Sequence, residues 1–390
     1  MGRLPWWFSP AGRRQRREAA RRREAQDLLD LLAGDAEFAP RLHALVVEAI
    51  GHRLASPNDA EGRPHLDPLS LALRELPNTV LNVKTLAADL ARRQAERLPA
   101  VPPPAAPRRI RLTSRVCRQA DMEQPWMAHW REALGARLSY HRKAWEYGFI
   151  LQALWEAGML APGKRGVGFA VGQEPLPSFL AARGVEVLAT DLDSADGRAA
   201  AWAATRQNAA RLDDLHHARL VDRETFLARC SFRPVDMNHV PADLAGGFDF
   251  VWSSCSFEHL GSIEQGLAFV EATMACLKPG GIAVHTTEYR FSEDGPKLDN
   301  WPCVAFSWQD MKMLAGRLAV RGHRMLPIEE AAGRLPLDGY IDTPPYAPMS
   351  GKGLALPAPP HLRVSVEGIP ATSLGIIVQA GPAGPSVASP

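Results

Sequence analysis

The stretch GVGFAVGQEPLPSFLAARGVEVLATDLD, residues 166–193, is the most informative part of this chain about its fold. It begins with an apolar segment that runs into small residues at Gly168, Ala170 and Gly172, continues into a segment opened by prolines, and ends with a second apolar segment that finishes at Asp191. Small residues allow a ligand to lie against the backbone, and a carboxylate one strand later can accept hydrogen bonds from both hydroxyls of a ribose. The stretch therefore predicts a strand–helix–strand unit that binds a ribose-containing ligand.

Short apolar segments alternate with helical segments from this point onward. The predicted strands are RGVGFAV, VEVLATD, SFRPVDM, FDFVWSS and IAVHTTEY. The predicted helices cover residues 175–183, 196–212, 262–277 and 307–321. This alternation implies right-handed crossovers, whereas the last two predicted strands, HLRVSVEG and TSLGIIVQ, are separated by only IPA, as in an antiparallel hairpin. We predict an α/β fold with a doubly wound, mostly parallel seven-stranded sheet and an antiparallel C-terminal hairpin.

The composition is that of an ordinary soluble protein. The 390 residues carry a net charge of +2, which indicates neither a nucleic-acid nor a membrane partner for the chain as a whole. The five cysteines form no paired motif, so we expect neither disulfides nor a cysteine zinc site and favour a reducing, cytoplasmic location. The start lacks the apolar core of a secretory signal, and no apolar run is long enough for a membrane span.

The chain divides into five predicted parts. They are a helical N-terminal region at 1–98, a proline-rich linker at 99–109, a helical lead-in at 110–160, the ligand-binding domain at 161–380 and a disordered tail at 381–390. The first 23 residues contain eight arginines and a single acid, Glu18. We favour a solvated helix face for this arginine-rich start; contact with an acidic partner, RNA or an anionic lipid is the alternative.

Two ligand classes carry the predicted ribose, a dinucleotide and S-adenosylmethionine. The dinucleotide motif G-x-G-x-x-G does not fit, because after Gly166 and Gly168 the third glycine, Gly172, comes one position late. Glu174, at the start of the next predicted helix, would repel a pyrophosphate. S-adenosylmethionine has no phosphate and carries a sulfonium and an ammonium, so a nearby carboxylate helps it. We therefore expect S-adenosylmethionine as the cofactor.

Further motifs agree with this choice. They are the glycine-containing first loop, Asp191 after the second strand, VDM at 235–237, FDFVWSSCSFEHL at 248–260 and LKPGG at 277–281. With these motifs, residues from about 140 to 380 resemble a class I S-adenosylmethionine-dependent methyltransferase of the group called methyltransferase type 11. The stretches HTTEY and SFEHLGS resemble bacterial enzymes found with glycosyltransferases in surface-glycan pathways. The resemblance implies methyl transfer to a small-molecule or glycan acceptor.

The first motif departs from the family pattern acid-x-G-x-G-x-G. Gly168 stands at the position of the acid, and Glu174 stands at that of the last glycine. The partner of the methionine ammonium is therefore open between Glu174 and Glu146. The residues predicted to bind the cofactor are Gly168, Ala170, Gly172, Glu174, Asp191, Leu192, Asp236, Met237 and Ser254.

A hydroxyl acceptor must lose a proton during methyl transfer, which calls for a base. His259, just after the fourth strand, is the first candidate; His285 and Glu288, at the end of the fifth, are the second set. A hydrogen-bonded packing role is the alternative for each histidine. Cys255 is interpreted as a buried thiol, and Glu258 as a helix cap or solvated acid.

Two segments could close over the ligands. The segment 139–149 contributes Tyr140, His141, Arg142 and Glu146, and the segment 335–361, with Tyr340, Asp342 and Tyr346, is a substrate lid or a plain surface loop. No metal-binding motif is present, so no metal ligand is predicted. Two other functions stay open, a non-catalytic scaffold on the same fold and an RNA methyltransferase anchored by the arginine-rich start.

Overall fold

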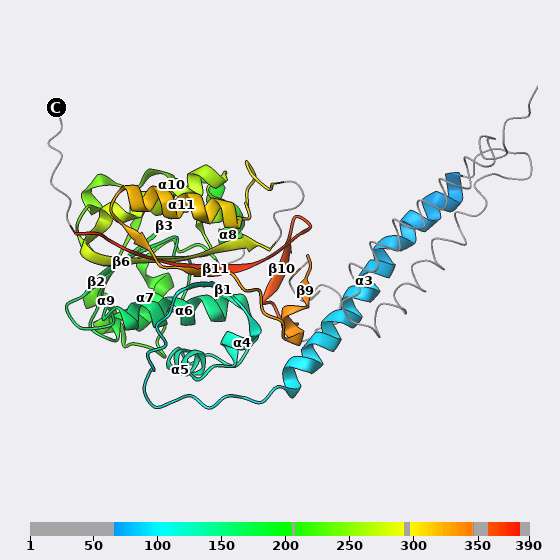
Figure 1. Ribbon diagram of the computed structural model, residues 1–390, viewed down its shortest axis with the longest axis horizontal. Coiled ribbons are helices and arrows are strands. Elements are labelled where there is room, and N and C mark those ends of the chain that lie inside the picture. The colour runs from blue at the N-terminus through cyan, green and yellow to red at the C-terminus, as the bar shows by residue number, and fades with distance from the viewer. Residues whose placement is uncertain (1–65, 205–206, 292–296, 345, 347–357, 383–390) are drawn as a thin grey trace, which may run out of the picture. The chain divides into compact units, whose positions relative to one another are not determined.

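The computed structural model describes residues 66–204, 207–291, 297–344, 346 and 358–382 (Figure 1). The predictions for the arginine-rich start, for most of the tail and for the middle of the lid segment lie outside these residues. The boundary between two compact units of the chain lies between Leu86 and Ala87, within the long helix α3 (Leu66–Arg97). None of the described helices has the length and apolar composition that a membrane span requires.

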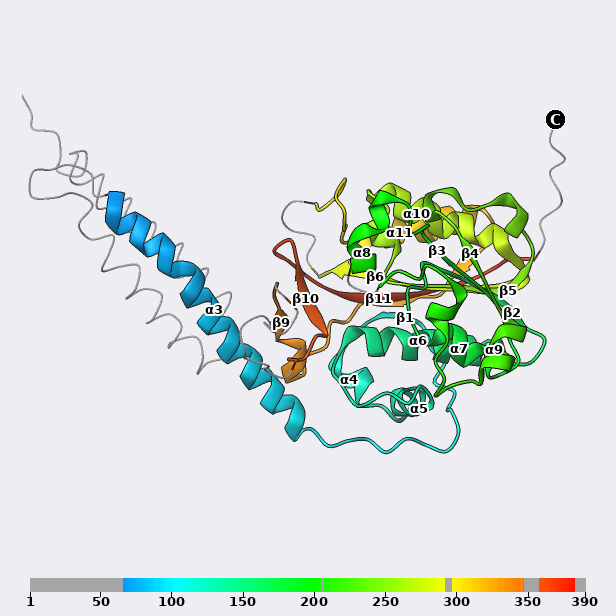
Figure 2. The same cartoon turned by 180° about the vertical axis from the view of Figure 1, so that it is seen from behind.

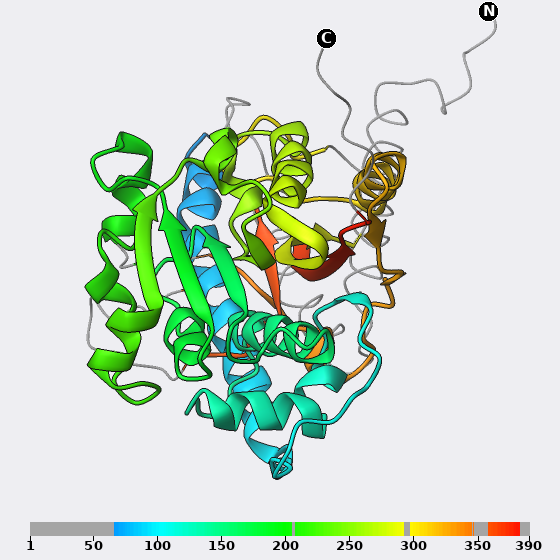
Figure 3. The ribbon, with the colours of Figure 1, turned by 90° about the vertical axis from the view of Figure 1, so that its left-hand side faces the viewer.

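The second unit is built on one sheet, whose described strands number eleven. They are β1 (Ser114–Val116), β2 (Arg165–Phe169), β3 (Glu186–Asp191), β4 (Cys230–Pro234), β5 (Phe248–Ser254), β6 (Leu277–Arg290), β7 (Arg324–Met325), β8 (Ile328–Glu329), β9 (Ile341–Asp342), β10 (Arg363–Val366) and β11 (Ile369–Gln379). The main order is β4-β3-β2-β5-β6-β11-β1-β8. Neighbours from β4 to β6 are parallel, and Figure 3 shows β2, β3 and β4 in green running side by side.

The C-terminal strand β11 is antiparallel to β6 and forms a hairpin with β10. The predicted fold class is confirmed, and all seven predicted strands are present. The sheet exceeds the predicted seven strands because β1, β7, β8 and β9, each of two or three residues, join its edge. Strands this short carry too few residues for an alternating apolar pattern to reveal them.

Helices cover both faces of the sheet. They are α4 (Gln119–Met122), α5 (Pro125–Ala133), α6 (Arg142–Glu156), α7 (Leu176–Ala181), α8 (Ala200–Ala204), α9 (Arg223–Arg229), α10 (Ile263–Thr273) and α11 (Trp308–Val320). Figures 1 and 2 show α10 and α11 on one face, with α6, α7 and α9 on the other. Each face has its own apolar core, one centred on α6 and α7 and the other on α10 and α11. Burial on both faces explains why the central strands are almost continuously apolar.

Helix α6 has the largest part in placing the site, because its first turn reaches the carboxyl ends of the strands. The predicted continuous helical lead-in is interrupted before it, where Gly135 adopts a positive φ of 63°. His141 then caps α6, since its Nδ1 accepts a hydrogen bond from the backbone N–H of Lys143 at 3.1 Å. Trp145 and Phe149 are fully buried on its inner face.

Candidate cofactor and active site

A cavity of about 440 Å³ lies at the carboxyl ends of β2, β3, β4 and β5. In doubly wound sheets this edge is the usual ligand site, and the volume is within the range of about 300–1,000 Å³ that small-molecule pockets occupy. All the predicted cofactor residues except Gly168 line the cavity. The sequence therefore identified loops that line this cavity.

Gly168 is the exception, and its role is packing. It lies inside β2, where a Cβ atom would come within 2.3 Å of the Trp252 ring and 2.6 Å of the Val171 side chain. The prediction that Gly168 contacts the cofactor is corrected: its missing side chain makes room for Trp252, whose indole then reaches the cavity wall.

Asp191 ends β3 with its carboxylate buried in the cavity wall. Oδ2 accepts hydrogen bonds from the backbone N–H groups of Gly172 at 3.1 Å and Ala209 at 2.8 Å, and Oδ1 accepts one from Leu192 at 2.8 Å. Burial raises the pKa of Asp191, although these backbone donors oppose the shift. Asp191 therefore joins three loops of the site, and Oδ1, which accepts only one of these hydrogen bonds, keeps a lone pair for a ligand hydroxyl.

Two non-glycine residues at the cavity have strained backbones. Ala170 follows β2 with φ of 47°, and Cys255 follows β5 with φ of 46°. Left-handed conformations of such residues cost about 1–3 kcal/mol and cluster at functional sites. Gly172, with φ of 54°, needs to be glycine also because a Cβ atom would lie 2.4 Å from the Gln207 carbonyl oxygen.

Glu174 places a carboxyl group in the cavity wall without an ion-pair partner among the described residues. The Trp252 indole Nε1–H donates to its Oε1 at 2.6 Å. Burial raises the pKa of Glu174 to about 8. A cationic ligand group beside this carboxyl would favour its ionised form.

The cationic side chains of the cavity are already paired with acids. Arg198 pairs with Asp236 at 2.9 Å and with Asp196, and Lys143 pairs with Glu146 at 2.9 Å. Arg142 forms its ion pair with Glu288. Since each described cation of the wall has a carboxylate partner, the wall offers little to a phosphate.

His259 lines the cavity, with its ring edge against Trp202 at 5.3 Å between ring centroids. Its Nδ1 lies 2.9 Å from the carbonyl oxygen of Pro302. A carbonyl oxygen only accepts, so Nδ1 carries the hydrogen and Nε2 keeps its lone pair in the neutral ring. Burial lowers the pKa of His259, which keeps the ring neutral near pH 7.

His285 is fully buried in the core and does not line the cavity. Thr273 Oγ1 donates to the Val270 carbonyl and therefore accepts from His285 Nε2 at 3.3 Å, while Nδ1 accepts from Ser253 Oγ at 2.8 Å. Burial lowers the pKa of His285 to about 3. The prediction that His285 serves as a base is corrected, because both of its ring nitrogens are engaged in hydrogen bonds that join β5 to α10.

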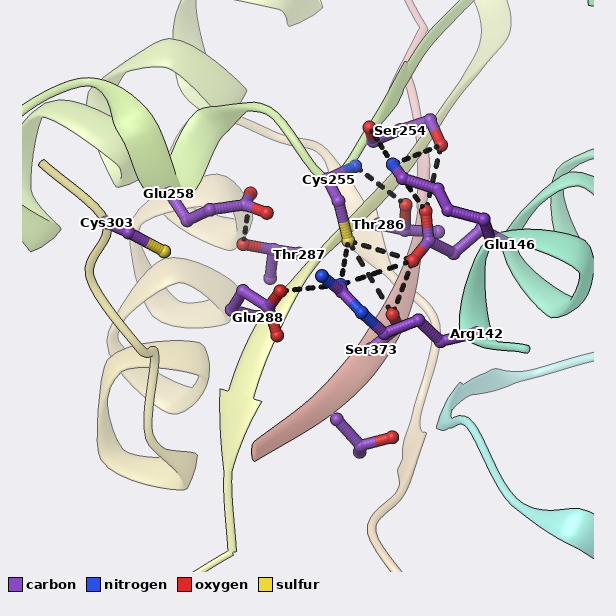
Figure 4. A network of polar contacts seen from close by, with 12 residues as sticks. Arg142, Glu146, Ser254, Cys255, Glu258, Thr286, Thr287, Glu288, Cys303 and Ser373 are labelled. Carbon is purple, nitrogen blue, oxygen red and sulfur yellow. Dashed lines mark hydrogen bonds and ion pairs between the residues drawn. The ribbon is translucent and has the colours of Figure 1, made fainter. Parts of the chain in front are cut away.

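A buried ionic cluster lies beside the cavity, where α6, β5, β6 and β11 meet (Figure 4). We define it as Arg142, Lys143, Glu146, Cys255, Glu258 and Glu288. Glu146 is its centre: the hydroxyls of Ser254 and Ser373 and the thiol of Cys255 donate to its carboxylate. Burial would raise the pKa of Glu146, but Lys143 and Arg142 outweigh that effect and hold it at about 2.

Glu258 and Glu288 are the other two acids of this ionic cluster. Burial raises the pKa of Glu258 to about 7, and it also raises the pKa of Glu288. Glu258 lines the cavity, although the sequence suggested a helix cap or solvated acid. Glu288 does not line it and reaches it only through its ion pair with Arg142.

The two segments predicted to close over the ligands differ in whether their residues line the cavity. Arg142 lines the cavity, whereas Tyr140 donates its hydroxyl to Glu123 and His141 caps α6. Of the lid residues, Asp342 accepts a hydrogen bond from His361 Nδ1 at 2.7 Å, Tyr346 donates to the Ser365 carbonyl, and neither lines the cavity. The lid function stays a prediction.

Sequence reasoning missed several residues of the cavity wall. They are Lys143, Tyr147, Val171, Gln173, Arg198, Trp202, Gln207, Val235, Asn238, Ser256, Leu260 and Gly261. Lys143 and Tyr147 lie in the segment 139–149 that the sequence singled out, and Arg198 and Trp202 lie in the predicted helix 196–212. No local pattern shows which side of a helix faces a cavity formed by other loops.

No protein-family model matches this chain, and no curated protein matches it in sequence. Solved structures with a similar fold include a proposed sarcosine dimethylglycine methyltransferase from Galdieria sulphuraria, with 16% identity over 53% of this chain and 65% of that chain and a TM-score of 0.35. Haemonchus contortus phosphoethanolamine N-methyltransferase 2, solved with S-adenosyl-L-methionine, is 18% identical over 43% of this chain and 35% of that chain, with a TM-score of 0.32.

A SAM-dependent methyltransferase from Aquifex aeolicus is 13% identical over 59% of this chain and 88% of that chain, with a TM-score of 0.32. The chain thus spans less than two thirds of the length of the first two proteins. Independently of these likenesses, the sheet has five parallel strands, an antiparallel terminal strand beside β6 and a cavity at the carboxyl edge. This is the doubly wound, mostly parallel sheet with an antiparallel terminal hairpin that the sequence predicts.

Proposed function

We propose that the chain is an S-adenosylmethionine-dependent methyltransferase that transfers a methyl group to a hydroxyl of a small molecule or glycan. One observation carries the proposal: the cavity exposes the carboxyl of Glu174 without a cationic partner among the described residues, while each described cation of the wall is paired with an acid. Such a wall suits an adenosine ligand that is positively charged and free of phosphate.

The residues present fit this cofactor. Asp191 Oδ1 keeps a lone pair for a ribose hydroxyl, and Glu174 can accept hydrogen bonds from the methionine ammonium. Glu146, the other candidate for that ammonium, already accepts from Lys143 and two hydroxyls, so we assign the role to Glu174. Asp236 and Met237 line the part of the wall that follows β4, where an acid can accept from the adenine amino group and a thioether can pack on the ring.

When bound, S-adenosylmethionine supplies an activated methyl group. The chain's own task is to align the acceptor, exclude water and remove the hydroxyl proton. His259 is the proposed base, because Nε2 keeps its lone pair at the cavity wall and Nδ1 is held by the Pro302 carbonyl. In this role His259 Nε2 would accept the proton of the acceptor hydroxyl.

Calorimetry with S-adenosylmethionine, its demethylated product and NAD⁺ tests the cofactor. We expect micromolar-range binding of the first two and none of the third. Binding of NAD⁺ that S-adenosylmethionine does not displace would end the proposal. Transfer of a labelled methyl group to small molecules or glycans of a cell extract then tests catalysis, since a non-catalytic scaffold would bind the cofactor without turnover.

The His259→Ala variant tests the base. We expect it to lose at least about a hundredfold in turnover, the usual share of a general base, and to bind S-adenosylmethionine as the wild-type chain does. His323→Ala, a change remote from the cavity, serves as the matched control and should keep full turnover. Unchanged turnover in His259→Ala would remove this histidine from the mechanism.

A further inference from the structure

We propose that Cys255, Glu258 and Glu288 form a binding site for a divalent transition-metal ion of the Zn²⁺ class. One ligand atom from each of these side chains lies within 4.8 Å of those of the other two. Figure 4 shows that the three side chains come from different elements and converge: Cys255 follows β5, Glu258 lies in the short 3-10 helix η6 (Phe257–His259), and Glu288 lies on β6. No local pattern marks this group, because its members are up to thirty-three positions apart in the sequence.

A second observation points to a missing ligand. Glu258 is 0% exposed and Glu288 is 3% exposed. Oε1 of Glu258 and Oε2 of Glu288 are buried and have no hydrogen-bond partner among the described residues. A buried carboxylate oxygen without a donor is costly, and native structures leave few of them. A metal ion between the two carboxylates would give both a partner.

The charges of the buried ionic cluster agree with a divalent ion. Its three carboxylates, on Glu146, Glu258 and Glu288, face two cations, Arg142 and Lys143. The ionised cluster therefore holds one negative charge in excess in a region of low dielectric, which is unfavourable. Cys255 binds a metal as the thiolate and releases its proton to solvent. With that thiolate and a divalent ion, the cluster sums to zero.

Arg142 is the group with which an ion would compete. Its Nη1 lies 3.4 Å from Cys255 Sγ and pairs with Glu288 Oε1. Thr287 donates to Glu258 Oε2 at 3.0 Å and leaves Oε1 of Glu258 free. The Cys255 thiol donates to Glu146 and lies 3.6 Å from Ser373 Oγ, and the hydrogen bond to Glu146 is lost when the thiolate forms. Binding thus requires the Arg142 guanidinium to move away from the sulfur, while its ion pair with Glu288 can persist.

The donor set selects the class of ion. Thiolate is a soft ligand that Zn²⁺ and its transition-metal neighbours accept, whereas Mg²⁺ and Ca²⁺ require oxygen. Three protein ligands leave a coordination position open, as in catalytic rather than structural zinc sites. Because Cys255 and Glu258 line the cavity, the ion would lie at its wall. If the proposed function holds, an ion there would bind and polarise the acceptor hydroxyl.

The test is a titration of the full chain, stripped of metal by a chelator under reducing conditions, with Co²⁺ as a spectroscopic probe and no methyl donor present. We expect one equivalent of Co²⁺ to give a thiolate-to-metal charge-transfer band that Zn²⁺ abolishes and Mg²⁺ does not. Cys255→Ser should lose the band, and Glu258→Gln should bind roughly 10- to 100-fold more weakly, the usual effect of impairing a metal ligand or its support. Cys303→Ser, a nearby half-buried thiol outside the ligand set, should behave as the wild type.

The site is overturned if the wild-type chain does not bind Co²⁺, if Co²⁺ binds without the charge-transfer band, or if the band persists in Cys255→Ser. If Cys255→Ser fails to fold, the site is tested by the band of the wild-type chain and by the weaker binding of Co²⁺ to Glu258→Gln. The Glu258→Gln variant keeps the hydrogen bond from Thr287. The titration contains no cofactor, so failure of metal binding leaves the methyltransferase proposal standing. If S-adenosylmethionine does not bind, the result of the Co²⁺ titration can still be interpreted, because it does not depend on the cofactor.

Discussion

Asp191 links the local fold to ligand binding through a single carboxylate. Its three backbone hydrogen bonds tie together the loops after β2 and β3 and the segment at Ala209. In Asp191→Ala these N–H groups lose their acceptor, so the change affects stability as well as affinity. Hydrogen bonds to a charged group are each worth about 1.5–3 kcal/mol.

We therefore expect Asp191→Ala to lower the unfolding midpoint and to weaken S-adenosylmethionine binding by roughly 10- to 100-fold, the equivalent of one charged hydrogen bond. Calorimetry and thermal unfolding measure the two effects. The control is Asp193→Ala, an exposed acid two positions further along the same loop, which should change neither quantity. Equal cofactor affinity in wild type and Asp191→Ala would contradict the ribose assignment.

Glu174 gives a prediction about pH. Its pKa is raised to about 8 by burial, so the free protein holds the carboxyl mostly protonated below that pH. The charged groups that face it are Lys143, Glu146 and Asp191, with Tyr147 nearby. A cationic ligand lowers the pKa of Glu174, and binding then releases its proton. Affinity should consequently rise with pH between 5.5 and 7.5, by at most roughly tenfold per unit for one proton.

Calorimetry at several pH values on wild type and Glu174→Gln checks this dependence. Glu174→Gln should bind the cofactor more weakly, and its affinity should change less with pH. A residual slope in the variant belongs to Glu258, the other cavity acid whose pKa burial raises into this range, to about 7. Identical slopes in the two proteins would show that Glu174 does not meet the ligand's positive charge.

At the scale of elements, the contact between α6 and β11 holds the buried ionic cluster in place. Gly375 on β11 leaves room for Phe149 of α6, and a Cβ atom there would lie 2.3 Å from that ring. Ser373, two residues earlier on the same strand, donates to Glu146 of the cluster. A larger residue at 375 should therefore push α6 away from β11 and disturb the cluster as well as the core.

Gly375→Ala should destabilise the domain by about 1–3 kcal/mol, the usual cost of overpacking a core, and should weaken cofactor binding. Gly316→Ala is the matched control, since Gly316 is exposed within α11 with open space around it, and the change should stabilise by about 1 kcal/mol through helix propensity. Urea unfolding and calorimetry measure both variants. A Gly375→Ala protein as stable as the wild type would refute this account of the α6–β11 contact.

For the whole molecule, ligand binding and stability are linked by mass action. A ligand present at one hundred times its Kd stabilises the folded state by about 2.7 kcal/mol. S-adenosylmethionine at that excess should raise the Tm of the full chain by several degrees, while NAD⁺ should leave it unchanged. Differential scanning measurements at increasing ligand concentration check the expected logarithmic rise. A Tm that responds to NAD⁺ but not to S-adenosylmethionine would reverse the choice of cofactor.

The layered α/β architecture can be predicted from the sequence, because strands that are buried on both faces are apolar and alternate with helices along the chain. It also located the loops of the cavity, since parallel strands bring their carboxyl ends to one edge and the residues after each strand meet there. The places of Asp191 and Glu174 at the cavity were predicted in this way, from their positions in the sequence.

Which side chains near those loops line the cavity and which lie in the core is seen only in the folded structure. Gly168 and His285 are at strand positions that suggest a ligand site. In the structure Gly168 leaves space for the Trp252 ring, and His285 forms hydrogen bonds to β5 and α10. The convergence of Cys255, Glu258 and Glu288 likewise has no local signal. Which face of a strand or turn a side chain takes, and what it meets there, depends on packing between segments that are distant in sequence.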